Sequence, residues 1–160
     1  MGTRGAIGFY KNGSEKVCYN HFDSYPTGLG EDLISWLNGK SVTELNDICD
    51  EIELSDDYVK GGGFSVENGF SKSFEDYHTF LINSVFCQYA YIINLDDKVV
   101  EFYSGINHNP DAKGRYAHLK CEGWGMSTVY GVKLRKKIPL SKFLKGKVKV
   151  SESGETFVVC

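Results

Sequence analysis

The sequence of 160 residues lacks the patterns that define several common functional classes. Its five widely spaced cysteines form no CxxC pair, which excludes a zinc knuckle and a thioredoxin-like site. Its four histidines show no HxxxH or HExxH spacing, and no GxxxxGKS or GxGxxG pattern indicates a nucleotide-triphosphate or Rossmann site. We therefore expect that the protein binds no metal ion and no cofactor.

The sequence also lacks targeting and membrane signals. No apolar run approaches the roughly 18 residues of a membrane helix. The first ten residues contain no apolar region typical of a signal peptide, and Ala6 stands where a myristoylation motif requires Ser or Thr. We therefore expect a cytoplasmic protein with reduced thiols and no membrane partner (in the host cytoplasm if a phage encodes it).

An excess of positive charge is missing as well. The 18 basic and 21 acidic side chains give a net charge of −3, which excludes a general coat for a nucleic-acid polymer. The distribution is uneven, because residues 133–160 hold eight of the basic side chains and only two of the acidic ones. If residues 127–138 form one regular strand, Lys133, Arg135 and Lys137 share a face. Local positive charge of this kind favours a small anionic partner, and a homo-oligomer is compatible with the sequence.

The length and the order of elements predict a single domain over residues 1–160, with an α+β fold. We expect a mainly antiparallel sheet packed against about three helices. The strands form hairpins at 3–22, 86–105 and 147–159, together with the strand at 127–138. Helices are predicted after Gly30, after the capping box of Ser41 and Glu44, and from Ser73 and Asp76 onward.

The first hairpin carries the strongest candidate for a catalytic group. Asn12-Gly13 is the preferred pair for a type I′ turn, and this turn places Arg4 opposite His21, with Asp23 on the same face. His21 is the candidate general acid or base, Arg4 would stabilise charge on a phosphate, and Asp23 would orient the imidazole or help to hold a ligand. An ion-pair cluster that orders the hairpin explains the same residues equally well.

Residues 104–125 form a polar, glycine-containing stretch without clear periodicity, either a binding loop or a surface excursion. Aromatic side chains in or near it are candidates for stacking on a base. The full set of predicted ligand-binding residues, from the hairpin and the loops, is Thr3, Asn20, Tyr25, His108, Arg115, Tyr116, His118 and Trp124.

Two resemblances add to these patterns. The segments TRGAIGF and YNHFDSYPTGLG resemble the opening of a group of small bacterial and phage proteins that share the pattern TRxxIxF, then YxHxDxYPxGLG. The leading hairpin is also similar in architecture to the start of N-terminal-nucleophile hydrolases, which implies that their layered fold is an option here. Gly2, which follows the initiator Met, is no nucleophile, so the resemblance does not extend to their amide chemistry.

The resemblance and the candidate residues together favour a phage-type counter-defence protein. Such a protein would bind, and in one version cleave, a nucleotide-derived signal such as a cyclic di- or oligonucleotide. Whether the chain is an enzyme stays open; cleavage would make it a phosphodiesterase-type hydrolase. The alternatives are a non-catalytic protein-interaction module and an amide hydrolase on an N-terminal-nucleophile-like scaffold.

Overall fold

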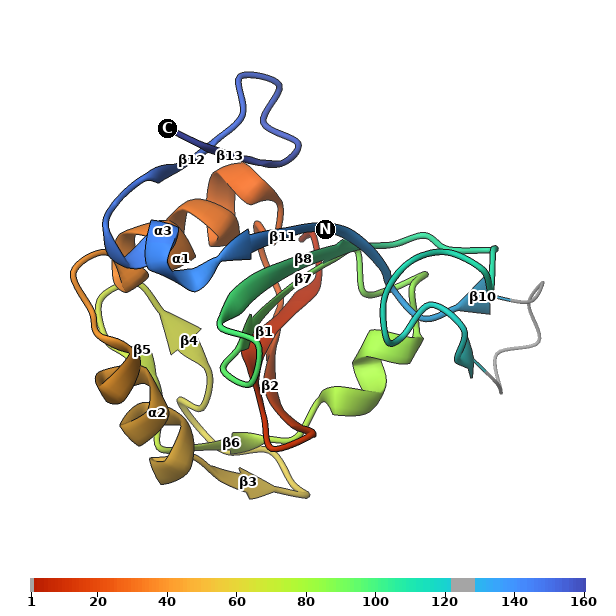
Figure 1. Cartoon of the computed structure of the whole chain (residues 1–160). Coiled ribbons are helices and arrows are strands. Elements are labelled where there is room, and N and C mark those ends of the chain that lie inside the picture. Colours follow the sequence, from red (N-terminus) through yellow and green to blue (C-terminus); the bar gives the residue numbers. More distant parts are fainter. Residues whose placement is uncertain (1, 122–128) are drawn as a thin grey trace.

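The computed structural model describes residues 2–121 and 129–160, and a five-stranded sheet forms its centre (Figure 1). The strands lie in the order β11-β8-β7-β1-β2. Their bounds are Gly5–Lys11 for β1, Ser14–Asn20 for β2, Tyr89–Asn94 for β7, Val99–Ser104 for β8 and Lys133–Pro139 for β11. Three of the four pairings within this sheet are antiparallel, and in the fourth β1 runs parallel to β7. The predicted α+β class, with a mainly antiparallel sheet, is confirmed.

The first hairpin has the predicted register. Ala6 pairs with Tyr19 and Gly8 with Val17, and Asn12 and Gly13 have the positive φ angles, 54° and 74°, of a type I′ turn. Both turn amides donate to the carboxylate of Asp96, at 2.8 and 3.1 Å. Asp96 belongs to the turn between β7 and β8, so it ties the two hairpin turns together.

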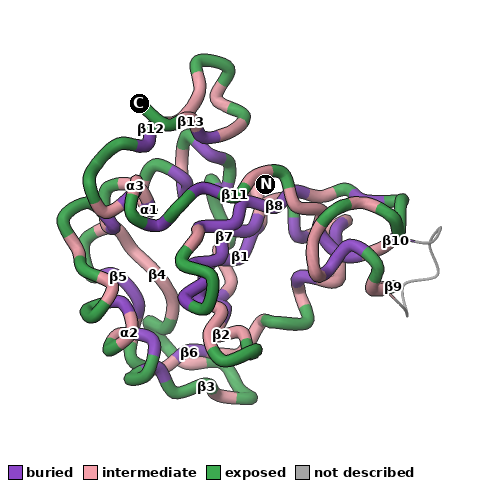
Figure 2. The backbone as a smooth tube through the Cα atoms, viewed as in Figure 1, coloured by how far each residue is buried: buried purple, intermediate pink, exposed green. Residues whose placement is uncertain are grey.

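The two faces of the sheet pack against different parts of the chain, and the strands between them are buried (Figure 2). One, which we call the helix face, packs against the helices and the terminal hairpin; its buried side chains include Ile7, Phe9, Cys18, Tyr91 and Phe102. The other, the loop face, packs against residues 78–82 and 105–119 and includes Ala6, Val17, Ala90, Ile92 and Tyr103. Alternation along β1 therefore divides the core as the sequence predicts.

Three α-helices cover the helix face: α1 (Glu31–Leu37), α2 (Val42–Glu51) and α3 (Leu140–Leu144). The capping box that opens α2 is present, with Ser41 and Glu44 bonded reciprocally. At the other end of α2, the Lys16 ammonium donates to the carbonyls of Cys49 and Ile52, and a cation at a helix C-terminus is favourable.

The helix predicted from Ser73 and Asp76 is wrong. Ser73–Glu75 form a strand, β6, that pairs in parallel with β3 (Glu53–Ser55), and a 3₁₀ turn, η2 (His78–Ile82), follows it. Pairing with a strand some 20 residues earlier overrides the local capping pattern. Asp76 does not pair with Ser73 at a helix start; its carboxylate instead accepts the backbone N–H of His78 at 3.0 Å at the start of the 3₁₀ turn.

Small elements complete the chain. They are η1 (Pro26–Gly30), β4 (Phe64–Ser65), β5 (Gly69–Phe70), β9 (Lys120–Cys121), β10 (Val129–Tyr130), β12 (Val148–Val150) and β13 (Phe157–Val159). The last two form the predicted terminal hairpin. Over the described residues, no helix has the length and apolar character needed to cross a membrane.

Candidate functional site

Five strand ends meet in one row at one end of the sheet. Asn20 closes β2 and pairs with Gly5 at the start of β1; Gly5 pairs with Tyr89 at the start of β7. Tyr89 pairs with Ser104 at the end of β8, and Ser104 pairs with Lys133 at the start of β11. Gly5 at the start of the first hairpin and Lys133 at the start of the basic strand are 128 residues apart in sequence, yet both lie at this end of the sheet.

A β-bulge places Arg135 on the helix face at this end. Lys133 pairs with Ser104 and Leu134 with Tyr103, but Lys136 pairs with Phe102, so Arg135 is an additional residue in the ladder. The Arg135 guanidinium donates from Nη1 to Ser104 Oγ at 3.1 Å. Bulges commonly redirect a side chain in this way. The predicted alternation over Lys133, Arg135 and Lys137 is therefore wrong, because Lys137 pairs with Glu101 and faces the other side.

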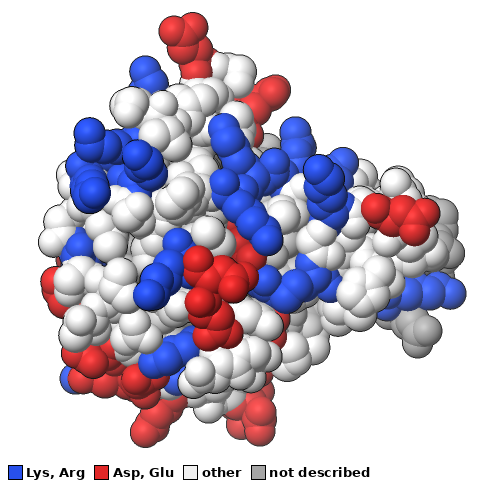
Figure 3. Space-filling model, viewed as in Figure 1, with Lys and Arg blue, Asp and Glu red and all other residues white. Residues whose placement is uncertain are grey.

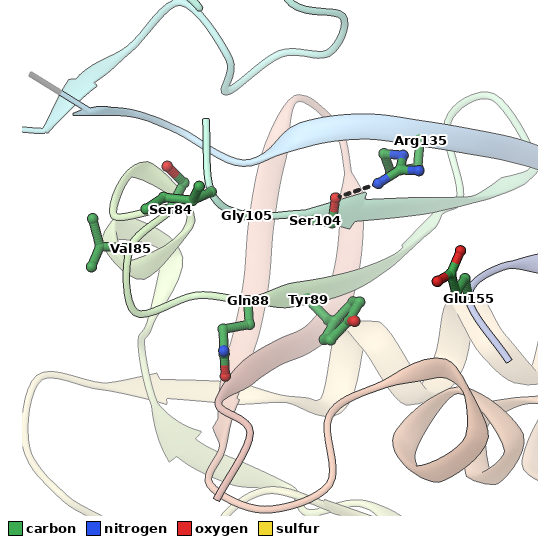
Figure 4. Close-up of a pocket in the computed structure, with 9 residues that line it drawn as sticks. Ser84, Val85, Gln88, Tyr89, Ser104, Gly105, Arg135 and Glu155 are labelled. Carbon is green, nitrogen blue, oxygen red and sulfur yellow. Dashed lines mark hydrogen bonds between the residues drawn. The ribbon is translucent and has the colours of Figure 1, made fainter. Parts of the chain in front are cut away.

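Arg135 lines a polar pocket of about 410 Å³ between the sheet end and the terminal hairpin (Figure 4). In Figure 4, Arg135 and Ser104 lie along one wall, Gln88 and Tyr89 along the opposite one, and the Glu155 carboxylate faces the space from the β12–β13 turn. The full lining is Ser84, Val85, Gln88, Tyr89, Ser104, Gly105, Ile106, Arg135 and Glu155. The pocket combines a cation, a carboxylate, an aromatic ring and an amide.

Three of the lining side chains are fixed by contacts with neighbouring residues. Tyr89 is half-buried, and its ring lies nearly parallel to that of Phe102, with centroids 6.0 Å apart. Ser104 is 3% exposed and holds Arg135. Ser84 is buried and accepts the backbone N–H of Asn107 at 2.9 Å. A wall that is held in this way loses little conformational entropy when a ligand binds.

Arg4, the predicted cation, lies beside this pocket. Its backbone N–H donates to Oε1 of Gln88 at 3.1 Å, and its carbonyl accepts the N–H of Gln88. Its guanidinium lies over the ring of Phe86, 5.6 Å from the centroid. Arg4 thus fixes the orientation of a lining side chain rather than contributing a lining charge itself.

His21 and Asp23 occupy the exposed segment that follows β2. Nδ1 of His21 lies 2.7 Å from the Tyr19 hydroxyl, and Asp23 accepts the Tyr25 hydroxyl at 2.9 Å. Among the described residues, no hydrogen bond or ion pair joins Arg4 to His21 or to Asp23. The three predicted catalytic side chains share an end of the sheet, but they engage separate neighbours.

The remaining candidates from the hairpin serve its local structure. The Thr3 carbonyl accepts the N–H of Ser24, and the Asn20 amide donates to Phe22 O and to Ser24 Oγ. The backbone N–H groups of residues 28–30, which precede α1, donate to carbonyls of Asp23 and Tyr25. These three amides of the glycine-containing turn are therefore already paired and not presented to an anion.

Arg115 and Tyr116 lie against the loop face of the sheet. Arg115 forms a two-point ion pair with Glu101, which is fully buried, and its guanidinium lies 3.8 Å from the ring centroid of Tyr10. The Tyr116 hydroxyl donates to Glu15 at 2.7 Å. Burial raises the pKa of Tyr116, so the phenol stays neutral. Both side chains are thus engaged inside the protein.

The remaining predicted ligand-binding residues are two histidines and a tryptophan of the 104–125 segment, and both histidines are exposed. His108 and His118 lie on the described part of the loop, and Trp124 lies outside the described residues. No group of three or more His, Cys, Asp or Glu side chains within residues 2–121 and 129–160 is arranged to hold a metal ion.

Sequence reasoning missed Gln88, Tyr89, Ser104 and Glu155 as a group. The only signal that could have found them is the sheet topology, because each is ordinary in its local segment. Comparison of the chain with protein-family models, with curated proteins and with solved structures finds no match in any of the three. The fold and the pocket thus define the molecule as an α+β protein with a polar pocket at one end of its sheet.

Proposed function

We propose that the protein binds a small nucleotide-derived anion, such as a cyclic di- or oligonucleotide signal, in the pocket lined by Arg135. The observation that carries the proposal is the Arg135 guanidinium, which a bulge directs into the pocket and Ser104 holds there. Nη1 is engaged with Ser104, and within residues 2–121 and 129–160 the other guanidinium N–H groups form no side-chain hydrogen bond or ion pair, so we expect them to meet oxygens of a ligand. A planar guanidinium fork matches the geometry of a phosphate.

The other walls support a nucleotide better than a bare anion. Tyr89 offers an aromatic surface for a base or a sugar, and Gln88 offers an amide. A volume of about 410 Å³ lies in the lower part of the roughly 300–1,000 Å³ range of small-molecule sites. That size suits one nucleotide unit of such a signal, and the remaining units of a cyclic di- or oligonucleotide would extend beyond the pocket.

Capture is the simpler activity for this site. Cleavage of a phosphodiester needs a general acid or base close to the phosphate, and the pocket lining contains no histidine. His21 would have to act from the adjacent segment. In a phage-type protein, capture alone would lower the free concentration of a host signal, which is the counter-defence role that the family resemblance suggests.

The proposal is tested by incubating the protein with a panel of cyclic di- and oligonucleotides and NAD-derived nucleotides. Equilibrium dialysis measures retention, and chromatography of the recovered ligand distinguishes capture from cleavage. We expect at least one nucleotide to be retained unchanged, and Arg135→Ala to weaken its retention at least tenfold. No retention and no turnover across the panel would contradict the proposal.

A second candidate, a module that binds an acidic protein, is favoured by one observation. Residues 133–150 carry eight cations and no acidic side chain. Lys and Arg gather over β11 and α3 on the face shown in Figure 3. Charge reversal at Lys137, which lies outside the pocket lining, separates the two candidates: it should slow association with an acidic partner and leave nucleotide binding unchanged.

A further inference from the structure

We infer that Glu155 makes the pocket selective for ligands that carry free ribose hydroxyls in addition to a phosphate. The inference rests on the proposed function and narrows it, because it names the part of the ligand that the second charged side chain recognises. The ligand class is then a ribonucleotide rather than a deoxynucleotide or an inorganic anion.

The starting point is the position of the Glu155 carboxylate. It comes from the β12–β13 turn, an element remote in sequence from the other walls, and it lines the same pocket as Arg135. Figure 4 shows its carboxylate directed into the space beside Tyr89. Within the described chain, the two charges form no ion pair, since no Arg135–Glu155 contact lies within 4.0 Å. Each charge is therefore available to a ligand.

A carboxylate in a pocket for an anion has a chemical consequence. It repels a phosphate placed near it, so a pocket meant for a bare anion would be better without it. A carboxylate accepts hydrogen bonds at its oxygens, and each free ribose hydroxyl donates one: the 5′-monophosphates offer two, and each ribose of a cyclic di- or oligonucleotide keeps one outside its phosphodiester. A ligand with its phosphate at Arg135 and its ribose hydroxyls at Glu155 satisfies both charges at once.

Gln88 supplies a third, independent constraint. Its Oε1 accepts the N–H of Arg4, so the side-chain amide is oriented with Nε2 as the group left to donate. The pocket wall opposite Arg135 therefore offers a donor at Gln88 beside the ring of Tyr89. An oxygen of the base or of a second phosphate is a suitable acceptor for that donor.

The size of the effect follows from the strength of hydrogen bonds to charged groups. Such bonds contribute about 1.5–3 kcal/mol each, and about 1.4 kcal/mol corresponds to a tenfold change in affinity. Loss of the ribose hydroxyls should therefore weaken binding about tenfold or more. Replacement of Glu155 by Gln removes the charge, so the difference between the two kinds of ligand should shrink.

The test is isothermal titration calorimetry with adenosine and guanosine 5′-monophosphates, their 2′,3′-dideoxy counterparts and inorganic phosphate. The proteins are the wild type, Glu155→Gln, Arg135→Ala and the matched control Glu152→Gln, which alters an exposed carboxylate of the same turn outside the pocket lining. We expect the ribonucleotide to bind the wild type and Glu152→Gln at least tenfold more tightly than the dideoxy form. In Glu155→Gln the ratio should fall to within about threefold, because the neutral amide is a weaker acceptor.

The outcomes separate the two proposals. Equal binding of ribose and dideoxy forms, together with a loss of both in Arg135→Ala, would overturn the role of Glu155 and leave the proposed function standing. The same would follow from a ratio that is unchanged in Glu155→Gln. Failure of every nucleotide to bind the wild type would overturn the proposed function itself.

Discussion

Arg115 and Glu101 form a two-point ion pair beneath the loop that crosses the loop face of the sheet. Nη1 lies 2.9 Å from Oε2 and Nη2 lies 2.5 Å from Oε1. Asn94 and Tyr103 also donate to the same carboxylate, which is 0% exposed. The pair therefore fastens residues 105–119 to β8 through a carboxylate whose acceptors are all used. Removing the pair tests how much it contributes to the free energy of unfolding.

Arg115→Ala should lower the free energy of unfolding by about 3 kcal/mol, because it leaves the Glu101 carboxylate buried without its cation. The value is taken from the lower end of the range for buried pairs, since the Arg115 side chain is 30% exposed. Urea unfolding measures it. The matched control Lys113→Ala, which removes an exposed cation from the same loop, should stay within about 0.5 kcal/mol of the wild type. Equal values for the two variants would contradict the role of the pair.

The same pair predicts a pH dependence. Hydrogen bonds from Arg115, Asn94 and Tyr103 outweigh the effect of burial and hold the pKa of Glu101 below its ordinary value. A lowered pKa in the folded state stabilises the protein above the unfolded pKa of roughly 4.3, and that contribution is lost as the pH falls further. Glu101→Gln should flatten this part of the stability curve below about pH 4.3, measured by thermal unfolding across pH. A curve that keeps the full acid dependence in the variant would show that other carboxylates cause it.

The pocket predicts a graded series at Arg135. Arg135→Ala should weaken nucleotide binding at least tenfold, because a charge-assisted hydrogen bond is worth about 1.5–3 kcal/mol. The affinity of Arg135→Lys should lie between those of the wild type and Arg135→Ala, because lysine keeps the charge but lacks the planar guanidinium. Lys137→Ala removes a cation from the same strand on the other face and should change the dissociation constant by less than about twofold at physiological salt. Equal losses at both positions would point to general charge attraction instead of a site.

Two glycines of the first hairpin should differ sharply in their tolerance of alanine. A Cβ on Gly8 would lie 2.1 Å from the Lys16 carbonyl oxygen, so Gly8→Ala should cost about 3 kcal/mol or prevent folding. At Gly13 no atom lies within 4 Å of the added Cβ, and only the φ of 74° opposes it. Gly13→Ala should therefore cost about 1–2 kcal/mol. Urea unfolding of both variants would contradict this account if Gly13→Ala were the more damaging.

The free cysteines should react with a thiol reagent in two groups. Burial raises the pKa of Cys18 to about 12 and also raises that of Cys87, while Cys160 is exposed. The thiolate is the reactive form, so Cys160 should react first in the folded protein near pH 8. Cys18 and Cys87 should react only after unfolding in urea. Cys160→Ser should remove the contribution of Cys160 to the fast phase and leave that of the partly exposed Cys121, and rapid reaction of Cys18 in the folded variant would contradict the assigned core.

The fold was predictable where the cause is local. Asn12-Gly13 specify the turn, the turn specifies the register, and Ser41 with Glu44 specify the start of α2. The helix predicted over 73–82 is wrong because Ser73–Glu75 pair with β3, 20 residues earlier, and a local pattern does not show that pairing. The bulge at Arg135 could not be predicted either, because nothing in the sequence KLRKKI indicates which residue has no partner in the ladder.

The candidate site was predictable only in part. The hairpin pattern singles out Arg4, which lies at the same end of the sheet as the pocket. Ser104 and Glu155 join Arg135 there through the topology of strands that meet only in the folded chain. Their residue types carry no distinctive pattern, so no spacing rule could group them.

The central claim is that a nucleotide binds in the pocket between the sheet end and the terminal hairpin. The most direct measurement is a titration of the ¹⁵N-labelled protein with the best-retained nucleotide, followed by amide chemical shifts. The account predicts saturable shifts at the amides of Gln88, Gly105 and Glu155, with the amides of the distant turn at Asn12 and Gly13 unchanged. Shifts confined to the exposed segment at His21–Tyr25, or no shifts at all, would contradict it.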